Sequence, residues 1–282
     1  MRTRSQKRLG ALKWISFPAE IRLMILLTIA NQKYPGWASH ASVCKEWQYV
    51  LEKANFYRMK LSVPCLNEFE SMVPLRKREF IHHIYLNVEL PRYTSTCCSK
   101  QRSPSIKISS IVSNGIWKLF SILSTWRPAT HLALEINVYS PSDCEHWFKN
   151  ISLSSDDSMY DIGEIPIGGR AIIPHHDLEH GWEHGQRIRA PPGSAVLRLY
   201  RPIRLVFHEL LPRVKAVTCL IIRRQLRRCI SPLGVGLLIG SLKGLEHMHI
   251  EPWAPCEAGN RELRDRGAPS PFILNPDHLS LI

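Results

Sequence analysis

Residues 14–51 read WISFPAEIRLMILLTIANQKYPGWASHASVCKEWQYVL, and the first half of this stretch predicts a helix that begins at Pro18. Proline suits the first helical position because its φ is fixed and the N–H that it lacks would have no partner there. With Phe17 as the N-cap, Glu20 falls at the third helical position, where a carboxylate favours the positive end of the helix.

This predicted helix is apolar around most of its circumference. One face has the spacing i, i+3, i+4, i+7, i+8 and consists of Ile21, Met24, Ile25, Thr28 and Ile29. Another side carries Leu23, Leu26, Leu27 and Ala30. A helix that is apolar on so many sides must be buried on more than one of them. We therefore expect a partner chain to cover part of it.

Two motifs in this stretch carry a family resemblance. Phe17-Pro18-x-Glu20-Ile21 resembles the opening of an F-box, and Val43-Cys44-Lys45-x-Trp47 resembles its close. The resemblance implies a small helical module that docks on the Skp adaptor of a cullin-type ubiquitin ligase. The adaptor-binding residues that it implies are Phe17, Pro18, Glu20, Ile21, Ile25, Leu26, Ile29, Val43 and Trp47. Among these, Glu20 would cap the helix, and Val43 and Trp47 would hold the helices at their angle.

The resemblance continues beyond this module. The runs WQYVLEKANFYRMKLS (47–62) and REFIHHIYLNVELPRY (78–93) are similar to a large group of filamentous-fungal F-box proteins. Members of this group are commonly longer at the C-terminus, so the chain resembles a shortened member.

Elsewhere the periodicity of apolar residues predicts helices and strands in turn. Apolar residues alternate at 84–90, 132–138, 214–222 and 245–250, which predicts strands. Helical spacing predicts helices at 46–59, 66–72, 116–126, 197–210 and 233–242. Residues 115–140 and 231–253 share one format, an apolar helix followed by an alternating strand. Such units stack in leucine-rich-repeat solenoids.

The spacing of the units is irregular, so we expect a degenerate horseshoe or a compact domain. The predicted fold class is α+β or α/β, with an N-terminal helical F-box-like module followed by an irregular leucine-rich-repeat-like helix/strand domain. The predicted organisation is a basic tail (1–12), the F-box-like module (13–60), a first helix/strand part (61–139), a flexible excursion (140–190), a second helix/strand part (191–253) and an irregular Pro-rich tail (254–282).

Composition limits the partners. The chain has 282 residues, with 37 Lys and Arg against 24 Asp and Glu, for a net charge of +13. This balance favours acidic partners. No zinc-ligand array or long basic helix accompanies the charge, so nucleic acid is an unlikely partner. The sequence shows no signal peptide and no apolar run of the roughly 20 residues that a membrane span needs. We therefore expect an intracellular protein, in the cytoplasm or nucleus, without a membrane partner.

Catalytic and metal chemistry find little support. His175, His176, His180 and His184 have metal-like spacing, but Pro174, Gly181 and Gly185 interrupt any helix through them. No nucleophile elbow and no phosphate-binding loop is present. The sequence therefore predicts no enzyme, no metal site and no cofactor.

The predicted function is a non-catalytic substrate receptor. The N-terminal helices would dock on the Skp adaptor, joined to the cullin scaffold, and the C-terminal domain would present an unknown protein substrate. Two alternatives remain open. In one, the F-box-like helices pack on the chain itself, giving a scaffold or orphan protein; in the other, the basic chain binds nucleic acid.

Overall fold

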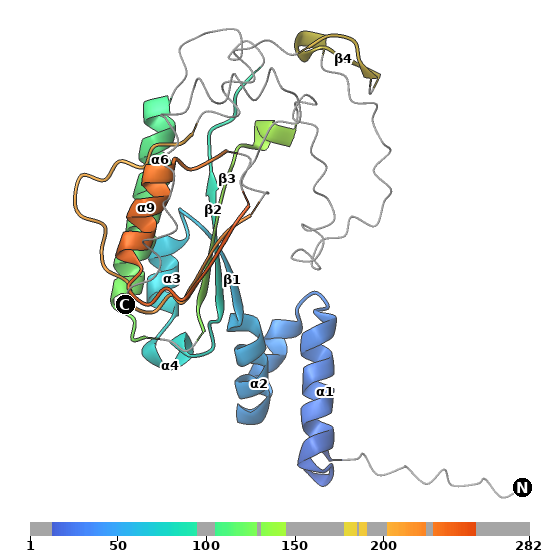
Figure 1. The fold of residues 1–282 in the computed structure, drawn as a ribbon. Coiled ribbons are helices and arrows are strands. Elements are labelled where there is room, and N and C mark those ends of the chain that lie inside the picture. Colours follow the sequence, from blue (N-terminus) through green and yellow to red (C-terminus); the bar gives the residue numbers. More distant parts are fainter. Residues whose placement is uncertain are drawn as a thin grey trace, which may run out of the picture.

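A mixed α/β architecture follows the N-terminal helices (Figure 1). The computed structural model describes residues 13–94, 105–128, 131–144, 178–184, 186–190, 202–223 and 228–251. The helical elements are η1 (Trp14–Ser16), α1 (Ala19–Gln32), η2 (Trp37–Ser42), α2 (Lys45–Phe56), α3 (Leu66–Met72), α4 (Leu75–Arg78), α6 (Ser105–Ser124), η3 (Pro141–Cys144), η5 (Leu178–His180) and α9 (Pro232–Ser241). The strands are β1 (Arg58–Ser62), β2 (His83–Glu89), β3 (Ala133–Tyr139), β4 (Trp182–Glu183), β5 (Gln186–Arg187), β6 (Cys219–Ile222) and β7 (His247–Ile250).

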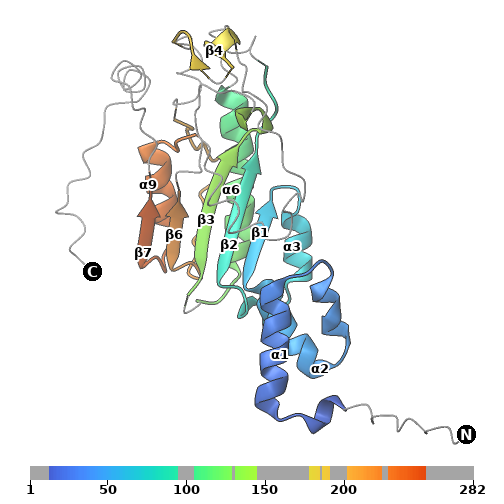
Figure 2. The same ribbon diagram turned by 90° about the vertical axis from the view of Figure 1, so that its right-hand side faces the viewer.

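The main sheet has five strands in the order β1-β2-β3-β6-β7, and β4 and β5 form a separate antiparallel pair. Every neighbouring pair in the main sheet is parallel. The order of the strands in this sheet is also their order along the chain. Parallel neighbours need a crossover connection, usually a helix. Helices α3, α6 and α9 all lie on one face of the sheet (Figures 1 and 2). The opposite face is called the open face below.

The core lies between the sheet and these helices. Alternate residues of each strand point to it, so that Leu61, Leu86 and Ile136 share one row of the register. The side of β2 and β3 that faces the helices is apolar and buried, and it consists of Ile84, Leu86, Val88, Leu134, Ile136 and Val138. On the other side His83, Glu135 and Asn137 are buried polar residues. The strands predicted from apolar residues at every second position are confirmed. The alternation arises because only one side of each strand packs against the helices.

Two predicted helices are wrong in whole or in part. Helix α2 ends at Phe56, and the residues expected to continue it to Met59 begin strand β1. The reason is pairing with β2, which joins Met59 to Ile84 in the register. No helix covers residues 202–210; instead Ile203 forms a parallel bridge with Ile230, and Val206 N donates to Ser113 Oγ (2.9 Å). Residues 197–201 lie outside the described residues.

Other boundaries move for tertiary reasons. Strand β6 begins at Cys219 rather than near 214, because Val214 instead forms an isolated bridge with Leu242. Helix α6 begins at Ser105, before the expected start at 116. The predicted helices at 66–72 and 233–242 agree with α3 and α9.

The start of α1 differs from the prediction by one residue. Pro18 is the N-cap, with ψ of 149°, and its carbonyl accepts the Arg22 N–H at 3.1 Å. Glu20 therefore stands at the second helical position, still within the first turn. The expectation of Phe17 as N-cap is wrong because Pro18 itself has an extended backbone, with ψ of 149°. The proline ring fixes φ but permits both the extended and the helical value of ψ.

Among the described residues, no helix combines the length and hydropathy that a bilayer crossing requires. The predicted tails at 1–12 and 254–282, and most of the excursion at 140–190, lie outside the described residues.

Candidate functional site

Helices α1 and α2 form a small module held by a few interior contacts. Leu26, Ala30 and Leu51 are its buried apolar residues. The chain turns after α1 through Gly36, whose φ of +81° lies in the left-handed region that favours glycine. The rings of Trp14 and Trp47 lie 5.2 Å apart and close the module on one side.

Glu46 ties the start of the module to α2. One carboxylate oxygen accepts Trp14 Nε1 at 3.0 Å, and the other accepts Arg22 Nε at 3.0 Å. The Trp14 hydrogen bond, followed by that of Arg22, holds the pKa of Glu46 below its ordinary value of 4.5. The carboxylate therefore fixes the segment before α1 against the first turn of α2.

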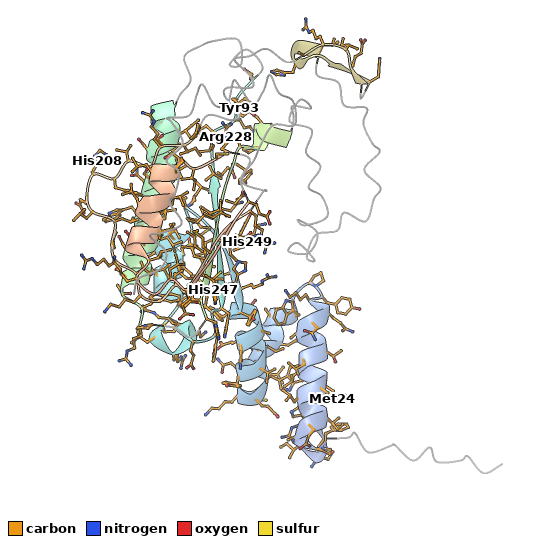
Figure 3. All side chains as sticks on the ribbon, in the orientation of Figure 1. Met24, Tyr93, His208, Arg228, His247 and His249 are labelled. Carbon is orange, nitrogen blue, oxygen red and sulfur yellow. The ribbon has the colours of Figure 1, made fainter. Side chains whose placement is uncertain are left out.

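The outward side of α1 is apolar and exposed. The exposed fractions are 40% for Ile21, 45% for Leu23, 62% for Met24, 36% for Ile25 and 45% for Leu27. Met24, in the middle of this side, is labelled in Figure 3. Only Leu26 and Ala30 of α1 are buried. Large apolar side chains gathered on one helix mark an interaction site in soluble proteins.

The residues predicted to bind an adaptor fall into three groups. Ile21, Ile25, Val43, Pro18 and Glu20 are exposed on the module. Phe17, Ile29 and Trp47 are half-buried. Leu26 is fully buried within the module, so it supports the helix from inside and adds nothing to the exposed surface.

Three exposed residues of α1 were missing from the predicted set. Leu23, Met24 and Leu27 belong to the exposed apolar surface as much as Ile21 and Ile25 do. The apolar pattern around the whole helix already contained them. The predicted set contained only the residues that match the F-box motif, and these three residues lie between the motif positions.

We call the set of Ile21, Leu23, Met24, Ile25 and Leu27 the α1 surface. The module that carries it is joined to the sheet through α2 and β1 (Figure 1). Lys77 Nζ lies 3.0 Å from Glu52 Oε1 and 4.9 Å from the centre of the Phe56 ring. Tyr57 stacks on His82 with ring centres 4.7 Å apart. These contacts hold α2 against the segment that leads into β2.

Glu52 at this joint is ionised more readily than usual. Burial raises its pKa, but hydrogen bonds from Gln48 and Lys77 outweigh burial, and the pKa is lowered. The lowered pKa favours the carboxylate form of Glu52, which is the form that pairs with Lys77 at this joint.

The open face of the sheet is polar, in contrast to the side that meets the helices. In register, one row contains Lys60, Tyr85, Glu135, Ile221 and His249. The row before it runs through Arg58, His83, Ala133, Cys219 and His247. The local sequence pattern does not predict these rows, because each row joins residues from strands that lie far apart in the chain.

A buried carboxylate lies at the centre of the open face. Glu135 on β3 is 1% exposed, His83 Nε2 lies 2.9 Å from its Oε2, and Arg223 Nε lies 3.1 Å from its Oε1. The group joins β2, β3 and the residue that follows β6. A buried carboxylate without polar partners would be costly, and the contacts with His83 and with the Arg223 guanidinium offset part of that cost.

Hydrogen bonds continue along the same face. Asn137 Nδ2 donates to Asn87 Oδ1 at 2.8 Å, and Tyr139 OH donates to Glu89 Oε2 at 2.8 Å. At the far strand His249 Nε2 lies 2.6 Å from Glu251 Oε1. Glu135, His83 and Asn137 are buried, whereas Glu89 and His249 are exposed and Tyr139 is half-buried. The accessible part of the face is thus polar, a composition suited to binding a polar segment of another protein.

The predicted histidine cluster divides between described and undescribed residues. His180 is buried, His184 has a φ of 47°, and His175 and His176 lie outside the described residues. Within the part of the chain that the structure describes, no group of three metal-ligating side chains comes together.

Comparisons of the chain with models of protein families, with curated proteins and with solved structures found no match. The F-box resemblance therefore rests on the residues at 17–47 themselves.

Proposed function

We propose that this chain is a non-catalytic substrate receptor of a cullin-type ubiquitin ligase, with the α1 surface as the contact for a Skp-type adaptor. The observation that carries the proposal is the exposure of Ile21, Leu23, Met24, Ile25 and Leu27 on one short helix. Helix-in-groove recognition relies on a few apolar anchors of this kind. The motif at 17–21 and the motif at 43–47 support the identity of the partner.

The internal construction of the module also supports this proposal. Leu26 and Ala30 attach α1 to its neighbours, and the Glu46 hydrogen bonds fix the segment before it. The α1 surface is thus presented on a helix that is already formed, so binding does not have to order it. Pre-organisation of this kind lowers the entropic cost of association.

The open face is the surface that we assign to the target. Helix α1 lies on the side of the sheet away from α6 and α9, which is the side of this face (Figure 1). A target bound there would be held on the side where the adaptor docks. Bringing a target near a ubiquitin-charged enzyme needs proximity and orientation, and no reactive residue on the receptor.

The test replaces one anchor by a charge. Ile25→Asp is expected to abolish co-purification with a co-expressed Skp-type adaptor, because a carboxylate buried without a partner at the contact costs about 3–5 kcal/mol. Ile25 is 36% exposed in the free chain, so the change is expected to leave the fold intact. Co-purification is measured by affinity capture, and the fold is checked by circular dichroism.

The matched control is Leu75→Asp, on α4. Leu75 is 75% exposed and lies outside the module, so this variant is expected to retain the adaptor. If Ile25→Asp still captures the adaptor at the level of Leu75→Asp, the assignment of the α1 surface is wrong. If the unsubstituted chain fails to capture the adaptor, the chain is better described as a scaffold without a ligase.

A further inference from the structure

Helix α9 is a second element with an apolar outward side, and the proposed function does not use it. Its ten residues include no charged side chain. Leu233 is 77% and Leu237 is 41% exposed. At Gly236 and Gly240 an added Cβ would meet nothing within 4 Å. These residues are spaced i, i+3, i+4 and i+7 and form one helical face, which needs cover from outside the described chain.

Among the described residues, the strand that follows α9 forms an edge of the sheet with no strand on its outer side. β7 pairs only with β6 in the main sheet, and Met248 on it is 49% exposed although it points to the helix-covered side. Natural edge strands are protected by shortness, charge, proline or a bulge, and β7, with four residues, has shortness alone within the strand. The opposite edge, β1, carries Arg58 and Lys60, whereas His247–Ile250 contains no lysine, arginine or proline. Within the part of the chain that the structure describes, the edge at β7 therefore remains able to accept a strand.

We propose that a second copy of this chain covers this end of the molecule. A two-fold axis along the normal of the sheet would pair the two β7 strands antiparallel and join the two sheets into one. The same axis keeps both α9 helices on one side of the joined sheet, where they would meet antiparallel near Gly236 and Leu237, midway along the helix. Isologous contacts of this type are the commonest in homodimers.

One register of the paired strands matches the side chains on both faces. With His249 on the axis, Met248 lies opposite Ile250 of the second copy, and both belong to the helix-covered side. On the open face His247 then lies opposite Glu251 of the second copy, a pair of complementary polarity. The two-fold axis produces each pair twice. The Met248–Ile250 pairs join apolar side chains, and each of the two His247 residues lies opposite Glu251 of the other copy. Cross-strand pairs of this kind stabilise antiparallel strands.

Small residues on α9 suit the contact between the helices. Gly236 and Gly240 let another backbone approach closely, and Leu233 and Leu237 supply apolar area beside them. The contact lies at the opposite edge of the sheet from β1 and α1 (Figure 2). Dimerisation would therefore leave the α1 surface of both copies accessible, and it does not depend on the proposed function.

The first test is the mass of the full chain in solution. Sedimentation at about 50 µM is expected to give twice the chain mass of 32.4 kDa. Leu237→Glu and Met248→Glu, both at exposed positions, are expected to give the mass of one chain while retaining the circular dichroism of the original. Ile25→Asp, at the other end of the molecule, is expected to remain dimeric. A monomeric original chain, or a dimer that survives both glutamates, would overturn the proposal.

The second test examines the register. In a background with Cys44, Cys65, Cys97, Cys98, Cys144 and Cys256 replaced by serine, which leaves the partly buried Cys219 and Cys229, His249→Cys places a thiol opposite its own symmetry mate. Antiparallel neighbours have Cα atoms about 5 Å apart, within the range of a disulfide. Mild oxidation is therefore expected to link His249→Cys into a covalent dimer and to leave His247→Cys unlinked. Equal linkage of the two variants, or linkage of His247→Cys alone, would overturn the register.

Discussion

Glu135 shows how one side chain can join distant parts of the chain. It lies on the central strand β3 and meets His83 of β2 on one side and Arg223, after β6, on the other. Its side chain is 2% exposed and that of Arg223 is 29% exposed, so the charges are only partly screened by water. The cluster stabilises the order of the strands rather than a local turn.

Glu135→Ala is expected to lower the free energy of unfolding by about 3 kcal/mol, because it leaves the buried His83 ring and the partly buried Arg223 guanidinium without their carboxylate partner. The control is Glu89→Ala on the neighbouring strand, where an exposed carboxylate accepts only the Tyr139 hydroxyl. That loss is expected to be under about 1 kcal/mol. Urea unfolding followed by circular dichroism measures both, and equal losses would contradict the role of Glu135.

Acid should release the segment before α1 by protonating Glu46. Its pKa lies below 4.5, so its stabilising effect is complete above pH 4.5 and is lost as the pH falls through the lowered value. The indole N–H resonance of Trp14, assigned with Trp14→Phe, is expected to shift in that range as the 3.0 Å hydrogen bond is lost. In Glu46→Gln this pH-dependent shift should disappear, and its persistence there would point to another group.

Among the elements, α6 approaches β1 more closely than a side chain allows. An added Cβ at Gly115 would lie 2.7 Å from Cγ2 of Val63, the residue just after β1. Glycine in a helix interior costs about 1 kcal/mol relative to alanine, so close packing is the reason for its presence here. The glycine lets a long helix lie flat against the edge of the sheet.

Gly115→Ala is expected to destabilise the chain, because overpacking at a branched side chain costs about 1–3 kcal/mol and exceeds the gain in helix propensity. In a Val63→Ala background the obstruction is removed, and the same change should raise stability by up to about 1 kcal/mol. A double-mutant cycle in thermal unfolding measures the coupling. A change of the same sign in both backgrounds would show that Val63 is not the obstacle.

Considered as a whole, the molecule has a buried centre and two exposed ends. β2 and β3 are flanked on both sides by other strands and covered by α3 and α6, whereas α1 buries only Leu26 and Ala30 (Figure 1). Local opening is least costly where few apolar contacts are lost. The ends are therefore the places where partners have most to stabilise.

Hydrogen exchange should follow this arrangement. Peptides spanning 83–89 and 133–139 are expected to exchange slowest, and peptides spanning 19–32 markedly faster in the isolated chain. Mass spectrometry of exchanged peptides checks the ranking, and adding the adaptor is expected to slow exchange at 19–32 alone. Equal protection of α1 and β2 in the isolated chain would contradict the description of α1 as a weakly supported helix.

Several elements were predictable because their physical cause is local. The alternation at Ile84, Leu86 and Val88 identifies β2 whatever lies beside it, since only one side of the strand can meet a core. The same holds for β3. The all-round apolar character of 21–30 likewise identified α1 and predicted that part of it would remain uncovered by this chain. Sequence alone therefore determined the central strands, α9 and the exposed side of α1.

Other features came from contacts between segments far apart in the chain. Residues 58–62 became a strand because β2 offered them hydrogen bonds, although the helix predicted at 46–59 included Arg58 and Met59. His83, Glu135 and Arg223 meet only through the register of β2, β3 and β6, which local periodicity does not specify. The open face and the unprotected edge at β7 likewise depend on strand order. Strand pairing is a non-local choice, so these features were decided by the tertiary structure.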